Sequence, residues 1–293
     1  MEAGWKLTSR PSPSPSFISD VEQSSPPRRL EGSGLGITLV NHSTVLLQQR
    51  GSNILTDPIW SERASPLSWV GPRRRRKPGV SWENLPPIGA VLISHNHYDH
   101  LDLPTLRRLA ARGDSTFIVP AGVGRLLRSE NIGPAHELDW GESLSLSEFT
   151  IHSVPAMHFS GRGIFDRNKT LWCGYVIESR ERLVYFAGDT DLCPEMDDIA
   201  GTVDVALLPV WGWGPRLGTG HLDPGRAAEA VRRIRPRIAI PIHWGTFYPF
   251  AFARIWPRPL GDPPHDFARE TARVAPDTQV RILGPGEAMA LGG

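Results

Sequence analysis

The chain carries Ser94-His95-Asn96-His97-Tyr98-Asp99-His100-Leu101-Asp102 directly after an apolar run at residues 90–93. A short apolar run of this kind is typical of a central strand, so the three imidazoles and the carboxylate follow a strand end. Imidazole nitrogens and carboxylate oxygens are ligands of zinc-like cations, and alternate residues leaving a strand can converge on one ion while the next pair turns towards a second. A polar turn would explain one exposed histidine but not this pattern. We therefore predict a metal site with room for two ions.

A two-ion site needs about six or seven protein ligands, so further His and Asp residues should follow other strands. Three residues meet this condition, since His158 follows the alternating run at 144–154, Asp189 follows 183–186, and His243 follows 238–242. Each alone has a structural explanation, as a histidine beside the core or an Asp in a tight turn. Together with the first motif, they are predicted to be ligands.

In this order, the motifs resemble those of the metallo-β-lactamase-fold hydrolases, whose pattern is His-x-His-x-Asp-His followed by separate His, Asp and His ligands. The resemblance implies an α/β fold, the four-layer αββα metallo-β-lactamase sandwich, and two Zn²⁺ ions per chain. It assigns His95, His97 and His158 to one zinc and Asp99, His100 and His243 to the other. Asp189 would bridge the two, and a hydroxide between the ions would be the nucleophile.

Further segments between roughly residues 36 and 250 resemble the N-acyl-phosphatidylethanolamine phospholipase D branch and its bacterial relatives. They are Thr56-Asp57-Pro58-Ile59-Trp60, Arg63-Ala64-Ser65-Pro66, Val70-Gly71-Pro72-Arg73, Asp166-Arg167-Asn168-Lys169, Leu171-Trp172 and His221-Leu222-Asp223-Pro224. The metal motif is shared by many chemistries, whereas these segments are more particular. The branch implies a phospholipid or another phosphodiester as substrate. One departure is Asp191, where the branch commonly has glycine after Gly-Asp-Thr.

Composition sets limits on the class of protein. The 293 residues are 40% hydrophobic, enough for a substantial core, and the proposed ligands run from 95 to 243, so we predict one hydrolase domain over residues 35–293. Residues 1–34 are rich in Ser and Pro from residue 8 onwards and are predicted to form a flexible arm. The net charge of +1 gives no reason to expect nucleic acid. Two cysteines, Cys173 and Cys193, are too few for a disulfide framework or a thiolate zinc site.

The N-terminus lacks the apolar run of a secretory signal, and no stretch approaches the ~20 apolar residues that span a bilayer. We therefore expect a cytoplasmic protein, with peripheral membrane contact as an open alternative. A homodimer is also open, because arms such as residues 1–34 contribute to assembly in dimeric relatives.

Strands are predicted at 36–49 (a pair turning at Asn41-His42-Ser43), 53–56, 90–94, 117–119, 144–154, 171–177, 183–186, 203–209, 238–242 and 279–283. Helices are predicted at 103–112, 123–129, 224–234 and 266–274. Asp223-Pro224 is an N-cap followed by proline at the first helical position, which places His221 near a helix entrance.

Four further side chains are candidates for function. Asp99 can orient the nucleophile or accept its proton while binding metal, and His221 is our candidate for protonating the leaving group or contacting phosphate. Asp102 would accept a hydrogen bond from a ligand imidazole or cap the following helix. The run 73–77 offers donors to a phosphate or an anionic membrane, with Arg73 favoured because it lies in the Gly-Pro-Arg segment, although such runs are also commonly just solvated.

The remaining aromatic and imidazole side chains receive simpler interpretations. Trp60, Trp69, Trp211 and Trp213 lie in loops, which is compatible with an apolar channel or membrane-facing rim, but packing is the simpler explanation. Trp244 is expected to support the metal loop. Structural or surface positions are expected for His42, His136, His152 and His265.

The leading hypothesis is a zinc-dependent phosphodiesterase that cleaves N-acyl-phosphatidylethanolamine or a related phospholipid in phospholipase D fashion. The first alternative is a lactonase or another ester hydrolase, because the same hydroxide can attack a carbonyl. A nuclease is disfavoured because no extended basic domain accompanies the site, and the diiron redox branch usually has Glu where His97 stands. A non-catalytic lipid- or partner-binding protein would not need the full ligand set.

Overall fold

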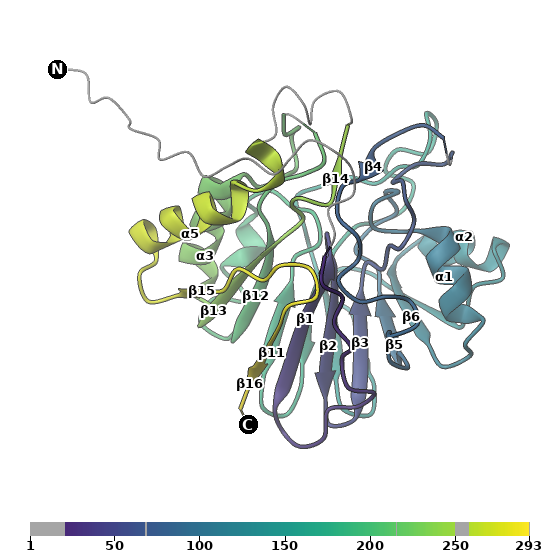
Figure 1. The fold of residues 1–293 in the computed structure, drawn as a ribbon, viewed down its shortest axis with the longest axis horizontal. Coiled ribbons are helices and arrows are strands. Elements are labelled where there is room, and N and C mark those ends of the chain that lie inside the picture. Colours follow the sequence, from purple (N-terminus) through teal and green to yellow (C-terminus); the bar gives the residue numbers. More distant parts are fainter. Residues whose placement is uncertain (1–20, 68, 215, 250–257, 293) are drawn as a thin grey trace.

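The computed structural model describes residues 21–67, 69–214, 216–249 and 258–292, which form two seven-stranded sheets (Figure 1). In spatial order the first sheet contains β16 (Ala288–Leu291), β1 (Leu35–Asn41), β2 (Thr44–Gln49), β3 (Ser52–Thr56), β5 (Ala90–Leu92), β6 (Thr116–Pro120) and β7 (Ala135–Leu138). The second contains β15 (Gln279–Val280), β13 (Ile238–Ile242), β12 (Val205–Pro209), β11 (Leu183–Phe186), β10 (Gly174–Glu178), β9 (Thr150–Val154) and β8 (Ser143–Ser145). A separate ribbon pairs β4 (Arg73–Arg74) with β14 (Phe247–Tyr248).

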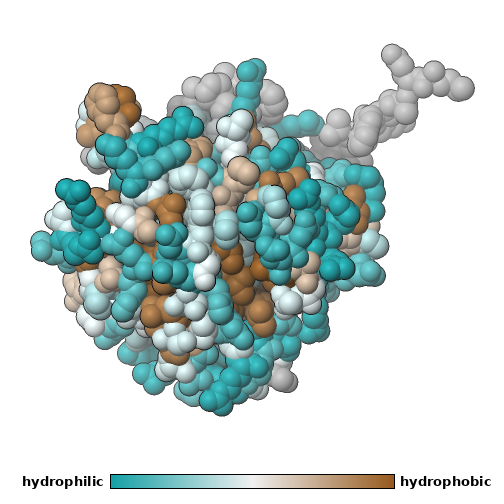
Figure 2. All heavy atoms as spheres, turned by 180° about the vertical axis from the view of Figure 1, so that it is seen from behind, coloured by the Kyte–Doolittle hydropathy of each residue, from teal (hydrophilic) through white to brown (hydrophobic). Residues whose placement is uncertain are grey.

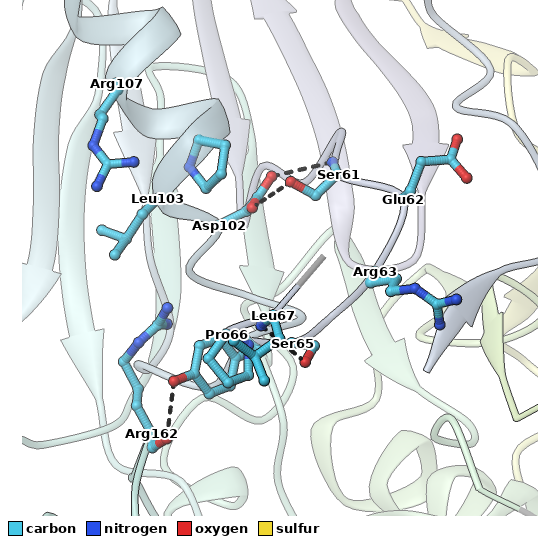
Figure 3. Close-up of a pocket in the computed structure, with 12 residues that line it drawn as sticks. Ser61, Glu62, Arg63, Ser65, Pro66, Leu67, Asp102, Leu103, Arg107 and Arg162 are labelled. Atoms are coloured by element: carbon cyan, nitrogen blue, oxygen red, sulfur yellow. Dashed lines mark hydrogen bonds between the residues drawn. The ribbon is translucent and has the colours of Figure 1, made fainter. Parts of the chain in front are cut away.

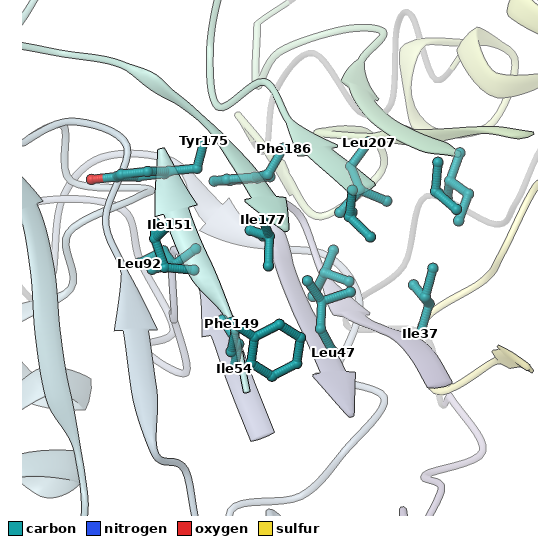
Figure 4. Packing of buried hydrophobic residues seen from close by; sticks show 14 of the residues in the cluster. Ile37, Leu47, Ile54, Leu92, Phe149, Ile151, Tyr175, Ile177, Phe186 and Leu207 are labelled. Atoms are coloured by element: carbon teal, nitrogen blue, oxygen red, sulfur yellow. The ribbon is translucent and has the colours of Figure 1, made fainter. Parts of the chain in front are cut away.

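The sheets pack face to face and helices cover their outer faces, which confirms the predicted four-layer αββα arrangement. Figure 4 shows the core between the sheets, where Leu47 and Leu92 of the first sheet meet Ile177 and Leu207 of the second. Helices α1 (Leu103–Ala110) and α2 (Val123–Ser129) pack on the first sheet, and α3 (Pro224–Ile234) and α5 (Pro263–Val274) on the second, on opposite sides of the molecule (Figure 1). Short 3-10 turns, η1 (Pro194–Met196) and η2 (Arg258–Leu260), complete the assignment.

Strand direction places the functional loops together. In the first sheet β3, β5, β6 and β7 run parallel, and in the second β11, β12, β13 and β15 do. The carboxyl ends of parallel strands meet at one edge of a sheet. Asp57 directly follows β3, His243 directly follows β13, and Asp189 lies three residues after β11. The loops after these strands therefore share an edge with the loop after β5.

Several elements differ from the sequence prediction. The run expected as one strand at 144–154 is a hairpin of β8 and β9, closed by the bond from Leu146 N to Phe149 O at 2.7 Å. Strands β7, β16, β4 and β14 were not predicted. Helix α5 begins at Pro263, earlier than expected, because Asp262-Pro263-Pro264 is tolerated in a first turn that has no intrahelical donors to lose.

The N-terminal arm, predicted as residues 1–34, is only partly covered, since residues 1–20 lie outside the described part of the chain. Residues 21–34 follow the body of the protein as extended chain. Ser24 N donates to Gly79 O at 2.7 Å, while Gln48 and Gln49 of β2 donate to the carbonyls of Pro27 and Ser33. This half of the predicted arm is therefore attached to the first sheet.

Among the described residues, none of the helices has the length and apolar character that a bilayer span requires. Both cysteines are buried and unpaired. Figure 2 shows a surface on which hydrophilic residues predominate and hydrophobic ones are interspersed.

Candidate metal centre

Three of the predicted ligands form one cluster. The ring nitrogens His95 Nε2 and His97 Nδ1 lie 2.7 Å apart, and His158 Nε2 lies 3.3 Å from the same His97 nitrogen. The three form a group whose ligand atoms are close enough to share an ion. His95 and His97 come from the loop after β5 and His158 from the segment after β9, so the cluster joins the two sheets.

The second cluster contains Asp99, His100 and His243, again as predicted, together with His42. His100 Nε2 and His243 Nε2 are 3.0 Å apart, and they lie 3.6 and 3.4 Å from Asp99 Oδ2. His42 Nε2 lies 3.0 Å from the same carboxylate oxygen. All four residues are buried and belong to one group of candidate ligands.

Asp189 lies between the clusters. Its Oδ2 is 3.2 Å from His100 Nε2 and 3.8 Å from His158 Nε2, while its Oδ1 is 3.2 Å from His243 Nε2. One carboxylate thus faces imidazoles of both clusters, as a bridging ligand would.

Hydrogen bonds on the far side of three rings fix which nitrogen faces inward. His158 Nδ1 donates to Gly220 O at 2.7 Å, His243 Nδ1 to Trp211 O at 2.8 Å, and His100 Nδ1 to Asp57 Oδ2 at 2.6 Å. Each ring therefore turns an Nε2 lone pair towards the centre, which is how outer partners prepare metal-binding histidines.

The donor set fits divalent cations. His100 Nε2 and His243 Nε2 lie 3.0 Å apart. Lone pairs on these two nitrogens would repel each other unless a cation or a proton lies near them. Asp189 Oδ1 is buried and accepts no hydrogen bond from the described residues. Asp57, Asp99 and Asp189 add negative charge at an interior position that needs positive charge to be stable. Imidazole and carboxylate ligands suit zinc and similar ions.

The charges of the cluster are strongly coupled. Burial lowers the pKa of His42 and His158 to about 3, so both are neutral and able to act as ligands or neutral donors near pH 7. Burial alone would raise the pKa of Asp99 and Asp189, but positive charge at His100, whose own pKa is raised against burial by the carboxylates around it, holds the pKa of both well below its usual range. Asp99 and Asp189 are therefore ionised, and a bound cation would take the place of the His100 proton and leave its Nε2 lone pair free to bind.

His221 lies at the edge of this centre, two residues before the Asp223 N-cap of α3, as predicted. Its Nε2 is 3.5 Å from Asp189 Oδ2 and its ring packs edge-on against His158 at 4.8 Å. Burial would lower the pKa of His221, but the hydrogen bond and charge of Asp189 outweigh burial and raise it. The side chain is still 19% exposed, so it borders both the centre and solvent.

Asp102 is placed differently from our expectation. Its carboxylate accepts from Ser61 N at 3.2 Å and from Ser61 Oγ at 2.7 Å (Figure 3). It also accepts from Thr105 Oγ1 at 2.5 Å and makes no side-chain bond to the α1 backbone. It contacts no ligand imidazole, because the loop after residue 100 turns it towards residues 61 and 105. The partner of a ligand imidazole is Asp57 instead.

The basic run 73–77 is largely structural. Arg74 is buried and donates to Ser61 O, Ile59 O and Asn41 Oδ1, with its guanidinium 5.0 Å from the Phe247 ring centre. Arg76 donates to Leu260 O. Arg73 points outward, with Nε 3.5 Å from Glu62 Oε2. Arg74 and Arg76 are therefore held by contacts within the fold, whereas Arg73 keeps an exposed guanidinium beside β14, which follows His243.

Two cavities share Tyr98 and Arg162, and one of them reaches His97. One, of about 420 Å³, is lined by Ser65, Leu67, Tyr98 and Arg162 among others (Figure 3). The second, of about 290 Å³, is lined by His97, Phe159 and Arg167 and shares Tyr98 and Arg162 with the first. Aromatic, aliphatic and cationic groups thus line the approach to the first ion cluster.

Two residues of the site were not identified from the sequence. Asp57 follows β3, which is parallel to β5, so its place at the same sheet edge could have been inferred. His42 lies in the β1–β2 turn, and nothing in its local sequence distinguishes it from a turn residue. The structural or surface position expected for it is wrong in part, because it is buried against Asp99.

Comparison with known proteins agrees with this geometry. A family model described as "Beta-lactamase superfamily domain" matches residues 52–244. The N-acyl-phosphatidylethanolamine-hydrolyzing phospholipase D 1 of Caenorhabditis elegans is 36% identical over 234 residues, which cover 73% of this chain and 65% of that protein. A metal-dependent hydrolase of Methanopyrus kandleri is 30% identical, covering 86% of this chain and 97% of that protein. The solved structure of Igni18, a metallo hydrolase from Ignicoccus hospitalis, has a TM-score of 0.65 at 24% identity and covers 89% of this chain and 100% of that one.

The fold and the arrangement of the His/Asp centre are of the metallo-β-lactamase type, and one of the similar proteins carries the name metal-dependent hydrolase. The chain belongs to the β-lactamase superfamily domain family. It spans 63 to 65% of the length of several curated relatives that it matches, among them the nematode phospholipase.

Proposed function

We propose that this protein is a zinc-dependent phosphodiesterase that cleaves N-acyl-phosphatidylethanolamine, or a related phospholipid, in phospholipase D fashion. The observation that carries the proposal is the 36% identity to the nematode enzyme across 73% of this chain. The products would be phosphatidic acid and an N-acylethanolamine.

In this proposal His95, His97 and His158 would hold one Zn²⁺ ion, Asp99, His100 and His243 would hold a second, and Asp189 would be shared between them. Two such ions lower the pKa of water and offset negative charge on a phosphoryl oxygen. The protein's part is to keep the ligands deprotonated and aimed inward. The bonds of His100, His158 and His243 to Asp57, Gly220 O and Trp211 O support that role.

Proton movement is assigned to two residues. Asp99 is ionised and can accept a proton from, and orient, an attacking water. His221 has a raised pKa, borders solvent and lies 3.5 Å from Asp189, so it can carry a proton to the departing alcohol oxygen or donate to the phosphate. The breaking bond is the one between phosphorus and the alcohol oxygen, and the new bond joins phosphorus to the water oxygen.

The substrate's charged and apolar parts have separate candidate contacts. Arg73 remains our candidate for a phosphate contact, supported by its exposed guanidinium on the β4–β14 ribbon next to the His243 loop. Aromatic and aliphatic side chains of the two cavities, such as Phe159 and Leu67, suit the acyl or glyceride chains.

A peripheral contact with the bilayer is part of the proposal. Ile164 and Phe165 are 90% and 85% exposed, and they are neighbours at the tip of the loop that lines the cavity beside His97. Asp166 holds this loop by accepting from Arg162 N at 2.9 Å and Gly163 N at 2.7 Å. A loop held by Asp166, with apolar residues at its tip and exposed Arg167 and Lys169 nearby, matches the headgroup region of an anionic membrane.

The test is product analysis by mass spectrometry after the zinc-loaded protein meets N-acyl-phosphatidylethanolamine vesicles. We expect phosphatidic acid and N-acylethanolamine, abolished in Asp99→Asn and unchanged in Asp277→Asn, which alters an exposed turn before β15. Absence of both products, with hydrolysis of a simple lactone or ester that depends on Asp99, would replace the phospholipase proposal with the ester-hydrolase alternative.

A further inference from the structure

His42 is the one residue of the second cluster that the ligand pattern does not assign. It lies at the β1–β2 turn with a φ of +47°, a backbone conformation that non-glycine residues rarely adopt and that tends to persist where surrounding contacts enforce it. Its ring is buried, 3.9 Å from the His243 ring centre and edge-on to Phe247 at 5.2 Å.

We infer that His42 is a positioning residue, whose Nε2–H fixes the carboxylate of Asp99 in the orientation that the second ion position requires. The inference rests on the two-ion centre proposed above, but not on any particular substrate. It assigns His42 no contact with the reacting atoms.

The hydrogen-bond pattern supports this role. His100 and His243 give their Nδ1–H groups to Asp57 and Trp211 O, so in the ion-bound centre their Nε2 atoms would be ligands and not donors to Asp99. His42 Nε2, 3.0 Å from Asp99 Oδ2, is then the imidazole nitrogen left to donate to this carboxylate in the described structure. Ligating carboxylates are themselves commonly held by such an outer hydrogen bond.

The backbone of His42 links the same ion position to a second ligand. Its N donates to Thr246 Oγ1 at 3.0 Å, and its O accepts from His243 N at 2.9 Å. One turn residue thus holds Asp99 through its ring and the His243 loop through its peptide. Loss of the ring donor should therefore weaken the position formed by Asp99, His100 and His243 and leave the His95, His97 and His158 position nearly unchanged.

The experiment measures two zinc dissociation constants by competition with a chromogenic chelator, in the full chain and three variants. His42→Phe keeps a ring but removes the donor, His42→Asn keeps an amide that is too short to reach Asp99, and His42→Gln places an amide N–H within reach. We expect one of the two constants to rise 10- to 100-fold in the Phe and Asn variants and to recover in the Gln variant, with the other constant unchanged within about twofold. His136→Phe, on the exposed part of β7, is the matched control.

The inference would be overturned if the Phe and Asn variants lost zinc affinity equally at both positions or at neither. It would also be overturned if the Gln variant bound zinc as weakly as the Phe variant. If the Phe variant does not fold, the Asn and Gln pair carries the same comparison. A wild-type protein that binds a single ion would refute the two-ion centre rather than the role of His42, and the same variants would then show whether His42 acts on that ion.

Discussion

At the scale of single residues, the buried carboxylate of Asp57 is the clearest case of a side chain that acts through a ligand. It accepts from His100 Nδ1, Ser94 N and Ser94 Oγ at 2.6 to 2.7 Å. Asp57→Asn removes the charge that fixes the His100 ring and its tautomer. We expect zinc affinity to fall about 10- to 100-fold, measured by chelator competition.

Asp102→Asn is the control for this prediction, since Asp102 is also buried and also accepts three hydrogen bonds but holds Ser61 and Thr105 instead of an imidazole. It should cost stability and leave zinc affinity within about twofold. Equal zinc affinity in the Asp57 and Asp102 variants would mean that His100 does not depend on its outer partner.

Two buried thiols give a prediction for alkaline pH. Burial raises the pKa of Cys173 to about 12 and of Cys193 to about 11, against 9.0 for the ordinary group. Between pH 9 and 10 the unfolded chain loses thiol protons that the folded chain keeps, so folding stability must fall as pH rises. We expect a loss of roughly 1 kcal/mol per thiol at pH 10, with buried Tyr175 and Tyr185 adding in the same direction.

The measurement is urea unfolding at pH 7.5, 9 and 10, with a thiol reagent at pH 8 as a second probe. Both thiols should stay unreactive in the native protein and react once it unfolds, because the thiolate is the reactive form. Constant stability across this range, or rapid native labelling, would contradict the burial of these groups.

The seven residues that the sequence predicted as metal ligands lie close together in the structure, because His-x-His-x-Asp-His and three strand-end residues leave few other arrangements. Whether ions bind them stays a prediction. The sequence did not predict Asp57 as the partner of His100 or His42 as the partner of Asp99, because a hydrogen bond to a ring nitrogen depends on loop geometry rather than on spacing. Asp102 was assigned the role that Asp57 has because it is near the motif in sequence, which is a poor guide where the chain turns sharply.

At the scale of elements, the turn from β11 into Asp189 depends on Gly188. Its φ is +61°, and a β-carbon there would lie 2.5 Å from Ser94 Cβ. Gly188→Ala must therefore shift the β11 or β5 loop and with them the proposed bridging carboxylate. We expect a loss of about 2–4 kcal/mol in the free energy of unfolding and weaker zinc binding.

Gly201→Ala separates backbone strain from the steric clash. Gly201 has a φ of +74°, but a β-carbon at this position would have Arg235 Nη2 as its nearest neighbour, at 3.9 Å. The free energy of unfolding of the variant should fall by only roughly 1 kcal/mol, which is the cost of placing alanine in the left-handed backbone conformation. Its zinc binding should be normal. Similar losses in both variants, measured by urea unfolding, would show that the contact with Ser94 is relieved without moving the loop.

Elements with strong patterns, such as β13, α2 and α3, were predicted with the same bounds that the structure has. The short edge strands β4, β14 and β16 were not, because their sequences have no clear alternation and their pairing depends on partners more than 170 residues away. The hairpin of β8 and β9 was merged into one strand, since both halves alternate with the same period and the turn lacks Gly or Pro.

At the scale of the whole molecule, the loop of Ile164 and Phe165 raises the question of how the protein meets a lipid substrate. This loop lines one of the two cavities that share Arg162, and the loop of Leu67 lines the other. Both loops lie at the upper right of Figure 1. Figure 2 shows the molecule from behind, so the same corner is at its upper left, where hydrophobic residues protrude. Burying two large apolar side chains in a bilayer interface contributes about 2–4 kcal/mol, or roughly 30- to 1,000-fold in affinity.

We therefore predict that the double variant Ile164→Ser, Phe165→Ser loses at least 30-fold in binding to anionic phospholipid vesicles, measured by cosedimentation. Hydrolysis of a short-chain diester in free solution should stay within about twofold, because neither side chain contacts the histidine clusters. Binding of the wild type should weaken as salt rises, since the exposed Arg167 and Lys169 lie close to the tip in the chain. Equal vesicle binding in both proteins would place the membrane contact elsewhere, whereas equal loss of diester and vesicle hydrolysis would make the loop part of the substrate site itself.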